Sequence, residues 1–190
     1  MLLLYIQFFK LKYIIGISCF YHDSAASILR DGKIIACAQE ERFTRVKHDS
    51  SFPFESIKFC LKYCNISLSE VSAVVFYEKP LIKFERLLET YLAFFPKGLK
   101  SFIVSLPLWI KEKLFQKKII HDNLKTIDNK FPLNKIKFSE HHLSHAASAF
   151  FPSPFNEAIV LTADGVGEWA TTTLAIGKNN KLKILKEINF

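Results

Sequence analysis

The chain has 190 residues, of which 49% are hydrophobic and 23% charged, the balance of an ordinary globular protein, which excludes a disordered or fibrous one. A typical domain takes about 100 to 150 residues, so this length suits one domain or one and a half. Most of the formal net charge of +8 comes from residues 97–137, which contain ten lysines and only three acidic residues. Because this segment contains no arginine, we interpret it as a solvated helical face; a surface for a phosphate-bearing ligand, a nucleic acid or a membrane is the alternative.

The amino-terminal residues and the cysteines both favour a cytoplasmic protein. Residues 1–9 are apolar and Lys10 and Lys12 follow them, whereas a signal peptide carries its positive charge first. No run reaches the roughly 20 apolar residues of a membrane helix, so we expect no membrane partner and interpret residues 1–11 as an extension. None of the four cysteines forms a C-x-x-C pair, and we interpret all as reduced thiols: Cys19, Cys37, Cys60 and Cys64.

The first third of the chain predicts three consecutive strands and a helix. Apolar, β-branched runs predict strands at residues 13–19, 25–29 and 33–39. The Asp31-Gly32 pair between two apolar runs is a strong hairpin signal. After a polar, charged segment, Pro53 opens a helix that runs to about residue 64.

The rest of the chain predicts a mixed segment and then three further strands. A strand at 69–77 precedes helices over 81–129, broken near Pro96 and Gly98 and again near Pro107. A strand at 135–138 leads into a short helix rich in histidine. The last strands are expected at 158–162, 169–176 and 182–188. A strand triplet that recurs after a mixed α/β segment indicates a duplicated α/β fold whose second copy has only begun.

Residues 139–150, SEHHLSHAASAF, carry three histidines. On a helix, His141 and His145 lie one turn apart on the same face, whereas His142 points about 100° away. Imidazole pairs at this spacing hold Zn or Fe in proteins. A surface histidine pair without a ligand is the alternative.

Residues 162–169, TADGVGEW, offer a third ligand. A strand that ends at Asp164 and runs into Gly165 and Gly167 places a carboxylate at the strand tip, beside a turn whose backbone can approach a phosphate closely. Asp164 would complete a set of two histidines and one carboxylate, which leaves coordination positions open for substrate oxygens. A plain Asp-Gly hairpin turn is the alternative.

Residues 20–28, FYHDSAASI, form the turn between the first two strands. His22 and Asp23 lie where a nucleotide-phosphate loop would be expected in a fold of this kind. Ser24 and Ser27 stand beside small alanines, which allows close approach of a ligand to the backbone. A capped turn explains the same residues almost as well.

Residues 39–53, QEERFTRVKHDSSFP, gather several cationic side chains. Arg42 and Arg45 have the planar fork that suits bidentate phosphate recognition, and Lys47 supplies a compact charge close to His48. Such a loop could neutralise a nucleotide phosphate or a developing oxyanion. A solvated charge run is the alternative.

Taken together, these segments resemble the amino-terminal region of the NodU/CmcH carbamoyltransferase family, which includes nodulation-factor and antibiotic O-carbamoyltransferases. The resemblance extends over about residues 12–190, and the segments occur in the family's order. The strings that carry it are GISCFYHDSAASILRDGKIIACAQEERFTRVKH, FSEHHLSHAASAFFPSPF and LTADGVGEWATTTLAIG.

The resemblance implies a fold and a division into lobes. The family's fold is similar to that of the tRNA threonylcarbamoyl-transfer proteins, within the sugar kinase and actin superfamily. An α/β, actin-like ATPase fold of the ribonuclease H-like class is therefore expected. Residues 12–155 would form its first lobe, and residues 156–190 would be the first strands of the second lobe.

The resemblance also implies an activity. In the family, carbamoyl phosphate and ATP give a carbamoyl-adenylate in a carboxy-terminal domain, and the actin-like domain transfers the carbamoyl group to a hydroxyl of a small molecule or glycan. His22 would orient or deprotonate that hydroxyl, and Lys47 would stabilise the developing negative charge. His141, His145 and Asp164 would hold a divalent metal, Fe(II) being favoured over Zn or Mn, on the adenylate's phosphate. The residues expected to bind nucleotide are Asp23, Ser24, Arg42, Arg45, Gly165 and Gly167.

Family members are chains of several hundred residues, and a further aspartate ligand expected by the family lies outside these 190. We therefore expect this polypeptide alone to be inactive and its carboxy-terminal half to be missing, or supplied as a separate chain. Two alternatives are a tRNA threonylcarbamoyl-transfer-like protein and a non-catalytic metal-binding remnant. The strings HDSAAS and EERFTRVKH favour the O-carbamoyltransferases, so a nucleic-acid partner is not expected.

Overall fold

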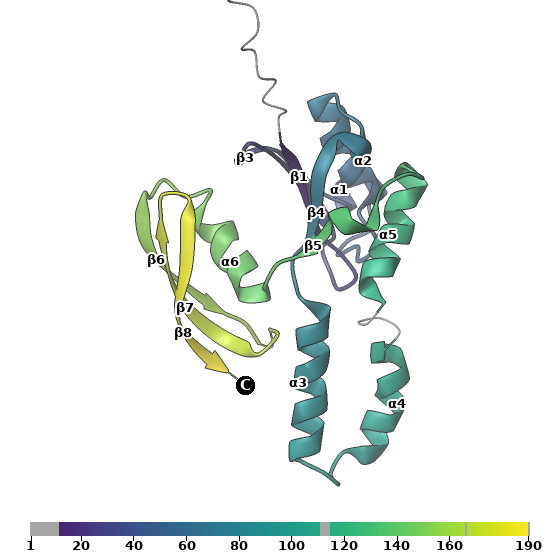
Figure 1. The fold of residues 1–190 in the computed structure, drawn as a ribbon, viewed down its shortest axis with the longest axis vertical. Helices are drawn as coiled ribbons and strands as arrows, with labels where there is room; N and C mark the ends of the chain where they lie inside the picture. Colours follow the sequence, from purple (N-terminus) through teal and green to yellow (C-terminus); the bar gives the residue numbers. More distant parts are fainter. Residues whose placement is uncertain (1–11, 111–114, 166, 190) are drawn as a thin grey trace, which may run out of the picture. The chain divides into compact units, whose positions relative to one another are not determined.

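The computed structural model of the protein describes residues 12–110, 115–165 and 167–189 (Figure 1). The chain divides into two compact units. The first unit comprises Met1–Val75 and His121–Lys137, and the second comprises Phe76–Ile120 and Phe138–Phe190.

A five-stranded sheet in the order β3-β2-β1-β4-β5 organises the first unit. Its strands are β1 (Tyr13–Ser18), β2 (Ala25–Arg30), β3 (Lys33–Gln39), β4 (Val71–Phe76) and β5 (Ile136–Phe138). β1 pairs antiparallel with β2, and β2 pairs antiparallel with β3 through the hairpin predicted at Asp31-Gly32. Ile15, Ile17 and Ile28 are buried, as the period of two in a half-covered strand requires. The predicted α/β class is therefore confirmed.

Helix α2 (Phe54–Cys64) covers β2 and β3. It begins directly after Pro53, as predicted, and Ile57, Cys60 and Leu61 form its buried face. Asn65 ends it in the left-handed conformation, with φ of 54°. This unit also contains three short elements and most of the longer helix α5, whose Leu124 is fully buried: α1 (Glu41–Thr44), η1 (Leu68–Glu70), η3 (Leu133–Lys135) and α5 (Gln116–Ile127).

A three-stranded antiparallel sheet, β6-β7-β8, belongs to the second unit. Its strands are β6 (Glu157–Ala163), β7 (Ala170–Lys178) and β8 (Lys181–Asn189). Helix α6 (His141–Phe150) packs on this sheet through Ala146 and Phe150, which meet Val160 and Ala175. The three predicted closing strands are confirmed, and the histidine segment is helical as expected.

Helices α3 (Pro80–Ala93) and α4 (Leu99–Trp109) form a hairpin in the second unit. The rings of Tyr91 in α3 and Phe102 in α4 stack on each other, with their centroids 3.9 Å apart. The predicted break near Gly98 is confirmed. The predicted break near Pro107 is also confirmed, because this proline lies in the last turn of α4, which ends at Trp109, and α5 begins at Gln116.

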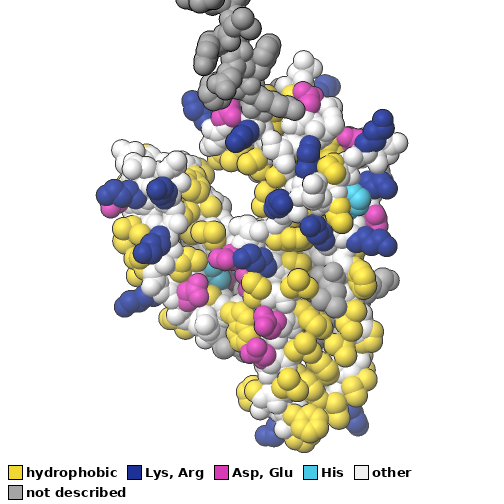
Figure 2. Space-filling view, in the orientation of Figure 1, with side chains coloured by type: hydrophobic (Ala, Val, Ile, Leu, Met, Phe, Trp, Pro, Cys, Tyr) yellow, Lys and Arg dark blue, Asp and Glu magenta, His cyan; other side chains and the backbone are white. Residues whose placement is uncertain are grey.

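The α3–α4 hairpin also exposes apolar side chains. Figure 2 shows hydrophobic side chains gathered over these two helices. The most exposed apolar residues of the hairpin are Leu81, Leu92, Phe94, Phe95, Ile103 and Val104. In the part of the chain that the structure describes, no helix is both long and apolar enough to cross a membrane.

Candidate metal centre

Helix α6 and the end of β6 bring three metal-ligating side chains together. His141 Nε2 lies 2.7 Å from Asp164 Oδ2 and 3.1 Å from His145 Nε2, and the last two atoms are 3.8 Å apart. The helix supplies two imidazoles because residues four apart share a face. The strand supplies the carboxylate because Asp164 follows its last residue, with its backbone N–H bonded to Thr171 O at 2.8 Å. The predicted convergence of these three side chains is therefore present in the structure.

The spacing of the three atoms fits one metal ion. Each of the three residues offers one ligand atom, and these three atoms lie within 4.8 Å of one another. A point equidistant from the three atoms in their plane is about 1.9 Å from each, slightly less than the roughly 2.0–2.1 Å bonds of Zn to imidazole nitrogen or carboxylate oxygen. An ion close to that plane can therefore contact all three atoms.

The protonation of the site also favours a cation. Burial lowers the pKa of His145, and the neighbouring His141 lowers it further, so the neutral ring with a free lone pair is preferred. Burial by itself would raise the pKa of Asp164, but hydrogen bonds from His141 and from the N–H of Gly165 outweigh it and bring the pKa below its ordinary value. Neutral imidazole and carboxylate are the forms that bind metals.

His142 holds the helix to the sheet instead of joining the cluster. Its buried ring lies 2.7 Å from Thr162 Oγ1 and 2.6 Å from Ala170 O, which join it to β6 and β7. Since a carbonyl can only accept, Nε2 carries the proton, and Nδ1 accepts from the threonine hydroxyl. This agrees with the direction predicted for His142. A Cβ atom on Gly167 would lie 2.8 Å from the same ring, so a larger residue at this position would clash with His142.

Three charged residues beside the cluster were not identified from the sequence as part of the site. Glu78 is buried, with Oε2 at 4.0 Å from His141 Nδ1 and 2.9 Å from Lys83 Nζ. Nδ1 of His141 is itself buried and has no hydrogen-bond partner among the described residues. Metal-bound histidines commonly place their second ring nitrogen near a carboxylate, as His141 does with Glu78. The sequence signal that could have identified Glu78 is its position directly after a predicted strand.

Glu168 and Arg86 are the other two. The carboxylate of Glu168 accepts a hydrogen bond from the backbone N–H of Lys79, and burial raises its pKa. Arg86 donates from Nη1 to Gly167 O at 2.7 Å, and burial lowers its pKa. Glu168 lies inside the TADGVGEW segment, but spacing alone does not reveal which N–H groups its side chain meets.

In the first unit, Asp23 bridges two histidines. Its Oδ1 lies 2.9 Å from His48 Nδ1, and its Oδ2 lies 2.8 Å from His22 Nδ1. The hydrogen bond with His48, and then the one with His22, lowers the pKa of Asp23. Both rings are exposed, so their Nε2 atoms are open to a ligand. The sequence placed His48 in the predicted cationic segment, residues 39–53. Its pairing with Asp23, 25 residues away, could be seen only in the folded structure.

The two loops that carry these residues are joined through their backbones. Phe20 N–H donates to Ser50 O at 2.8 Å, and Ser24 N–H donates to Asp49 O at 2.7 Å. Lys47 is exposed on the second loop, one residue before His48. The structure therefore carries both residues predicted for the transfer step on neighbouring segments of one unit.

The residues predicted to bind nucleotide have different surroundings. Arg42 and Arg45 are exposed, and Arg45 ends α1 in the left-handed conformation. Ser24 is buried, and its hydroxyl has no partner among the described residues, so its side chain does not face solvent. Gly165 is exposed, with open space where a Cβ would stand. A binding role for these residues stays a prediction.

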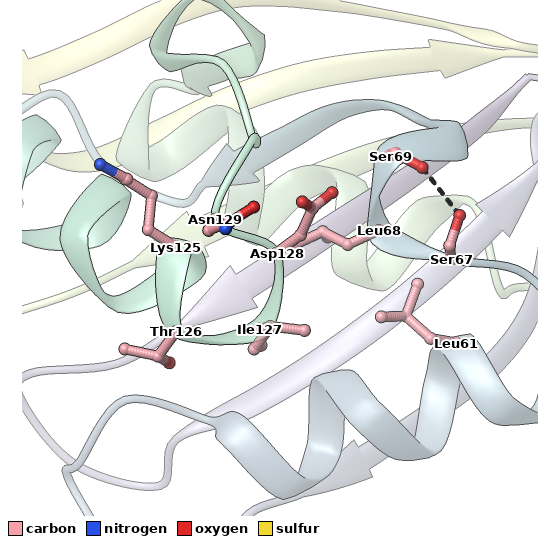
Figure 3. A pocket seen from close by; sticks show the side chains of 9 residues that line it. All are labelled: Leu61, Ser67, Leu68, Ser69, Lys125, Thr126, Ile127, Asp128 and Asn129. Atoms are coloured by element: carbon pink, nitrogen blue, oxygen red, sulfur yellow. Dashed lines mark hydrogen bonds between the residues drawn. The ribbon is translucent and has the colours of Figure 1, made fainter.

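The first unit also contains an open groove of about 620 Å³ between α2, η1 and the end of α5 (Figure 3). Leu61, Leu68 and Lys125 are among its lining residues. None of the residues predicted from the sequence for catalysis, nucleotide or metal lines it.

Comparison with known proteins decides the family. Residues 13–190 match the family model described as Carbamoyltransferase N-terminus. The chain belongs to this family. The resemblance seen in the sequence is thereby confirmed, on a match that covers both units.

Curated relatives of this carbamoyltransferase amino-terminal domain are longer than the chain. The uncharacterized protein sll1178 of Synechocystis is 56% identical over 186 residues, which are 95% of this chain and 30% of that protein. The nodulation protein NolNO of Sinorhizobium fredii is 35% identical over 169 residues, 87% of this chain and 23% of that protein. The chain thus spans less than a third of the length of these relatives.

Proposed function

We propose that this chain is the amino-terminal domain of an O-carbamoyltransferase and that His141, His145 and Asp164 hold a divalent metal ion at the phosphate of a carbamoyl-adenylate. The supporting observation is the approach of three ligand atoms to within 4.8 Å in a chain of the carbamoyltransferase family. The strand order β3-β2-β1-β4-β5 is compatible with the first lobe of an actin-like, ribonuclease H-like fold, which we propose for residues 12–155.

The donor set suits Fe(II), with Zn and Mn as alternatives. Two imidazoles and one carboxylate leave coordination positions open for phosphate oxygens. A divalent cation bound there would supply positive charge to those oxygens as the adenylate leaves. Asp164, ionised at neutral pH, would offset part of the ion's charge, and the two rings would fix its position.

For the transfer step, we propose that His22 takes the proton of the acceptor hydroxyl. The freed oxygen then bonds to the carbamoyl carbon while the bond between that carbon and the adenylate oxygen breaks, and AMP leaves. Asp23 supports this role because it binds Nδ1 of His22 at 2.8 Å and so directs Nε2 outward as the base. Lys47 would stabilise the negative charge that develops on the carbamoyl oxygen.

Metal analysis of the purified chain tests the metal centre. We expect one equivalent of Fe(II), Zn or Mn to bind the wild type, and His141→Ala or Asp164→Asn to lower the affinity by 100-fold or more because a direct ligand is lost. His22→Ala is the matched control, since it also removes a histidine but lies outside the cluster. A wild type that binds none of these metals, or equal binding by the His141→Ala chain, would refute the metal centre.

A further inference from the structure

Asp23 is the centre of a hydrogen-bonded group of three side chains in the first unit. Its Oδ2 accepts from Nδ1 of His22 at 2.8 Å, and its Oδ1 accepts from Nδ1 of His48 at 2.9 Å. Because an ionised carboxylate can only accept, both rings carry their proton on Nδ1 when neutral and leave Nε2 without one. Neutral histidine in water prefers the opposite tautomer, with the proton on Nε2. The carboxylate therefore selects the tautomer that a base acting through Nε2 requires.

His22 and Asp23 alone do not fix each other in space. They are neighbours in one turn, so a bond between their side chains leaves the pair free to swing together. His48 lies 25 residues further along the chain, on a second loop, and gives Asp23 an anchor outside the turn. The hydrogen bond with His48 is also the largest influence that lowers the pKa of Asp23.

The loop that carries His48 is itself held in place beside this bond. The carboxylate of the next residue, Asp49, accepts from Thr44 Oγ1 at 2.7 Å. The backbone O of Asp49 accepts from the N–H of Ser24, the residue directly after Asp23, at 2.7 Å. Backbone and side-chain bonds thus fix the distance between the two loops where Asp23 and His48 meet.

Both ends of the bond between the loops have an uncommon backbone conformation. Asp23 has a φ of 50° and His48 a φ of 56°, in the left-handed region. Residues other than glycine enter this region at a cost that the surrounding structure must offset, and residues held there concentrate at functional sites. We therefore interpret the bond as a built feature of the two loops and not as a chance contact of exposed side chains.

We infer that His48 is a positioning residue for the transfer centre: through Asp23 it holds His22 with Nδ1 bonded and Nε2 open to the acceptor hydroxyl. The inference rests on the proposed role of His22 as the base and adds to it a residue that reaches the base only through the carboxylate.

The tautomer of His22 tests this inference, because nitrogen NMR of the ring in the full chain distinguishes Nδ1–H from Nε2–H. The measurement is made at a pH at which the rings are neutral. In the wild type we expect the Nδ1–H form to predominate. His48→Gly removes the ring and suits the left-handed backbone. In this variant we expect the ratio of Nδ1–H to Nε2–H at His22 to fall by about 3- to 5-fold, the effect of losing one hydrogen bond.

His48→Asn should restore the wild-type ratio, since the asparagine NH₂ group takes the place of Nδ1 and asparagine also adopts the left-handed conformation. Val46→Ala is the matched control, because Val46 is exposed on the same loop, and it should leave the ratio unchanged. If His48→Gly disturbs folding, as judged by circular dichroism, His48→Asp is measured instead, since its carboxylate cannot donate to Asp23.

A wild type rich in the Nδ1–H form whose ratio survives the loss of His48 would overturn the positioning role alone. An asparagine variant with a ratio as low as that of the glycine variant would also overturn it, because the loop and not the hydrogen bond would then carry the effect. A wild type in which Nε2–H predominates would remove the Asp23 contact that supports His22 as the base, and this inference with it. None of these outcomes affects the metal centre, which is tested by metal binding.

Discussion

Glu40 shows how a single charged side chain can organise a fold from inside it. Only 2% of the residue is exposed, yet its carboxylate accepts hydrogen bonds from Glu55 N–H, Ser56 N–H and Ser56 Oγ at 2.7 to 2.9 Å. These donors belong to the first turn of α2, where backbone N–H groups lack helical partners. The charge of Glu40 therefore replaces a conventional side-chain cap at the start of that helix.

We predict that Glu40→Gln lowers the free energy of unfolding by about 1–3 kcal/mol, because its NH₂ group meets donors where the carboxylate had accepted. Urea unfolding followed by circular dichroism measures the loss. Glu55→Gln, on the exposed side of the same turn and paired with Lys58, should change stability by less than about 0.5 kcal/mol. Equal stabilities for the two variants would contradict this account of Glu40.

At the scale of elements, the contact of α6 with β7 decides where the two histidines stand. Gly177 on β7 faces the ring of Phe150, and a Cβ atom there would lie 2.5 Å from that ring. Phe150 is 3% exposed and belongs to the core of the second unit, so the ring has little freedom to move. The glycine allows the helix to lie close to the sheet.

We predict that Gly177→Ala destabilises the protein by about 1–3 kcal/mol through overpacking. In a double-mutant cycle with Phe150→Leu, which frees space, the double variant should be more stable than the sum of the two single effects implies, by about 0.5 kcal/mol or more. Thermal unfolding provides the four stabilities. Strict additivity would show that Gly177 and Phe150 do not constrain each other.

At the scale of the whole molecule, the division into two units places all three proposed metal ligands in one of them, the second. A ligand stabilises only those parts of a protein whose unfolding releases it. Metal binding should therefore stabilise the second unit without stabilising the sheet of the first unit.

We predict that metal at 100 times its dissociation constant stabilises the second unit by about 2.7 kcal/mol. Hydrogen exchange should slow by about 100-fold at β6 and β7 and remain unchanged at β1 to β3, and the Asp164→Asn chain should show neither change. Equal slowing in both sheets would mean that the two units unfold together.

Much of this fold and site could be predicted because it depends on local patterns. Alternating apolar residues predicted the strands, Asp31-Gly32 predicted the hairpin, and the spacing of His141 and His145 predicted a shared helical face. Pro107 predicted a helix break nearby, and α4 ends at Trp109, because a proline in the last turn removes one backbone hydrogen bond without ending the helix at the proline itself. Roles in catalysis and nucleotide binding stay predictions.

The sequence by itself determined the family, the order of strands and helices, and the shared helical face of His141 and His145, because each follows from residue types and local spacings. Only the tertiary structure decided that Glu78 faces His141, that Glu168 binds the N–H of Lys79, and that Asp23 bridges His22 and His48. These pairs are brought together by the packing of separate elements, and the energy of such contacts depends on three-dimensional distance, which no local spacing along the chain encodes.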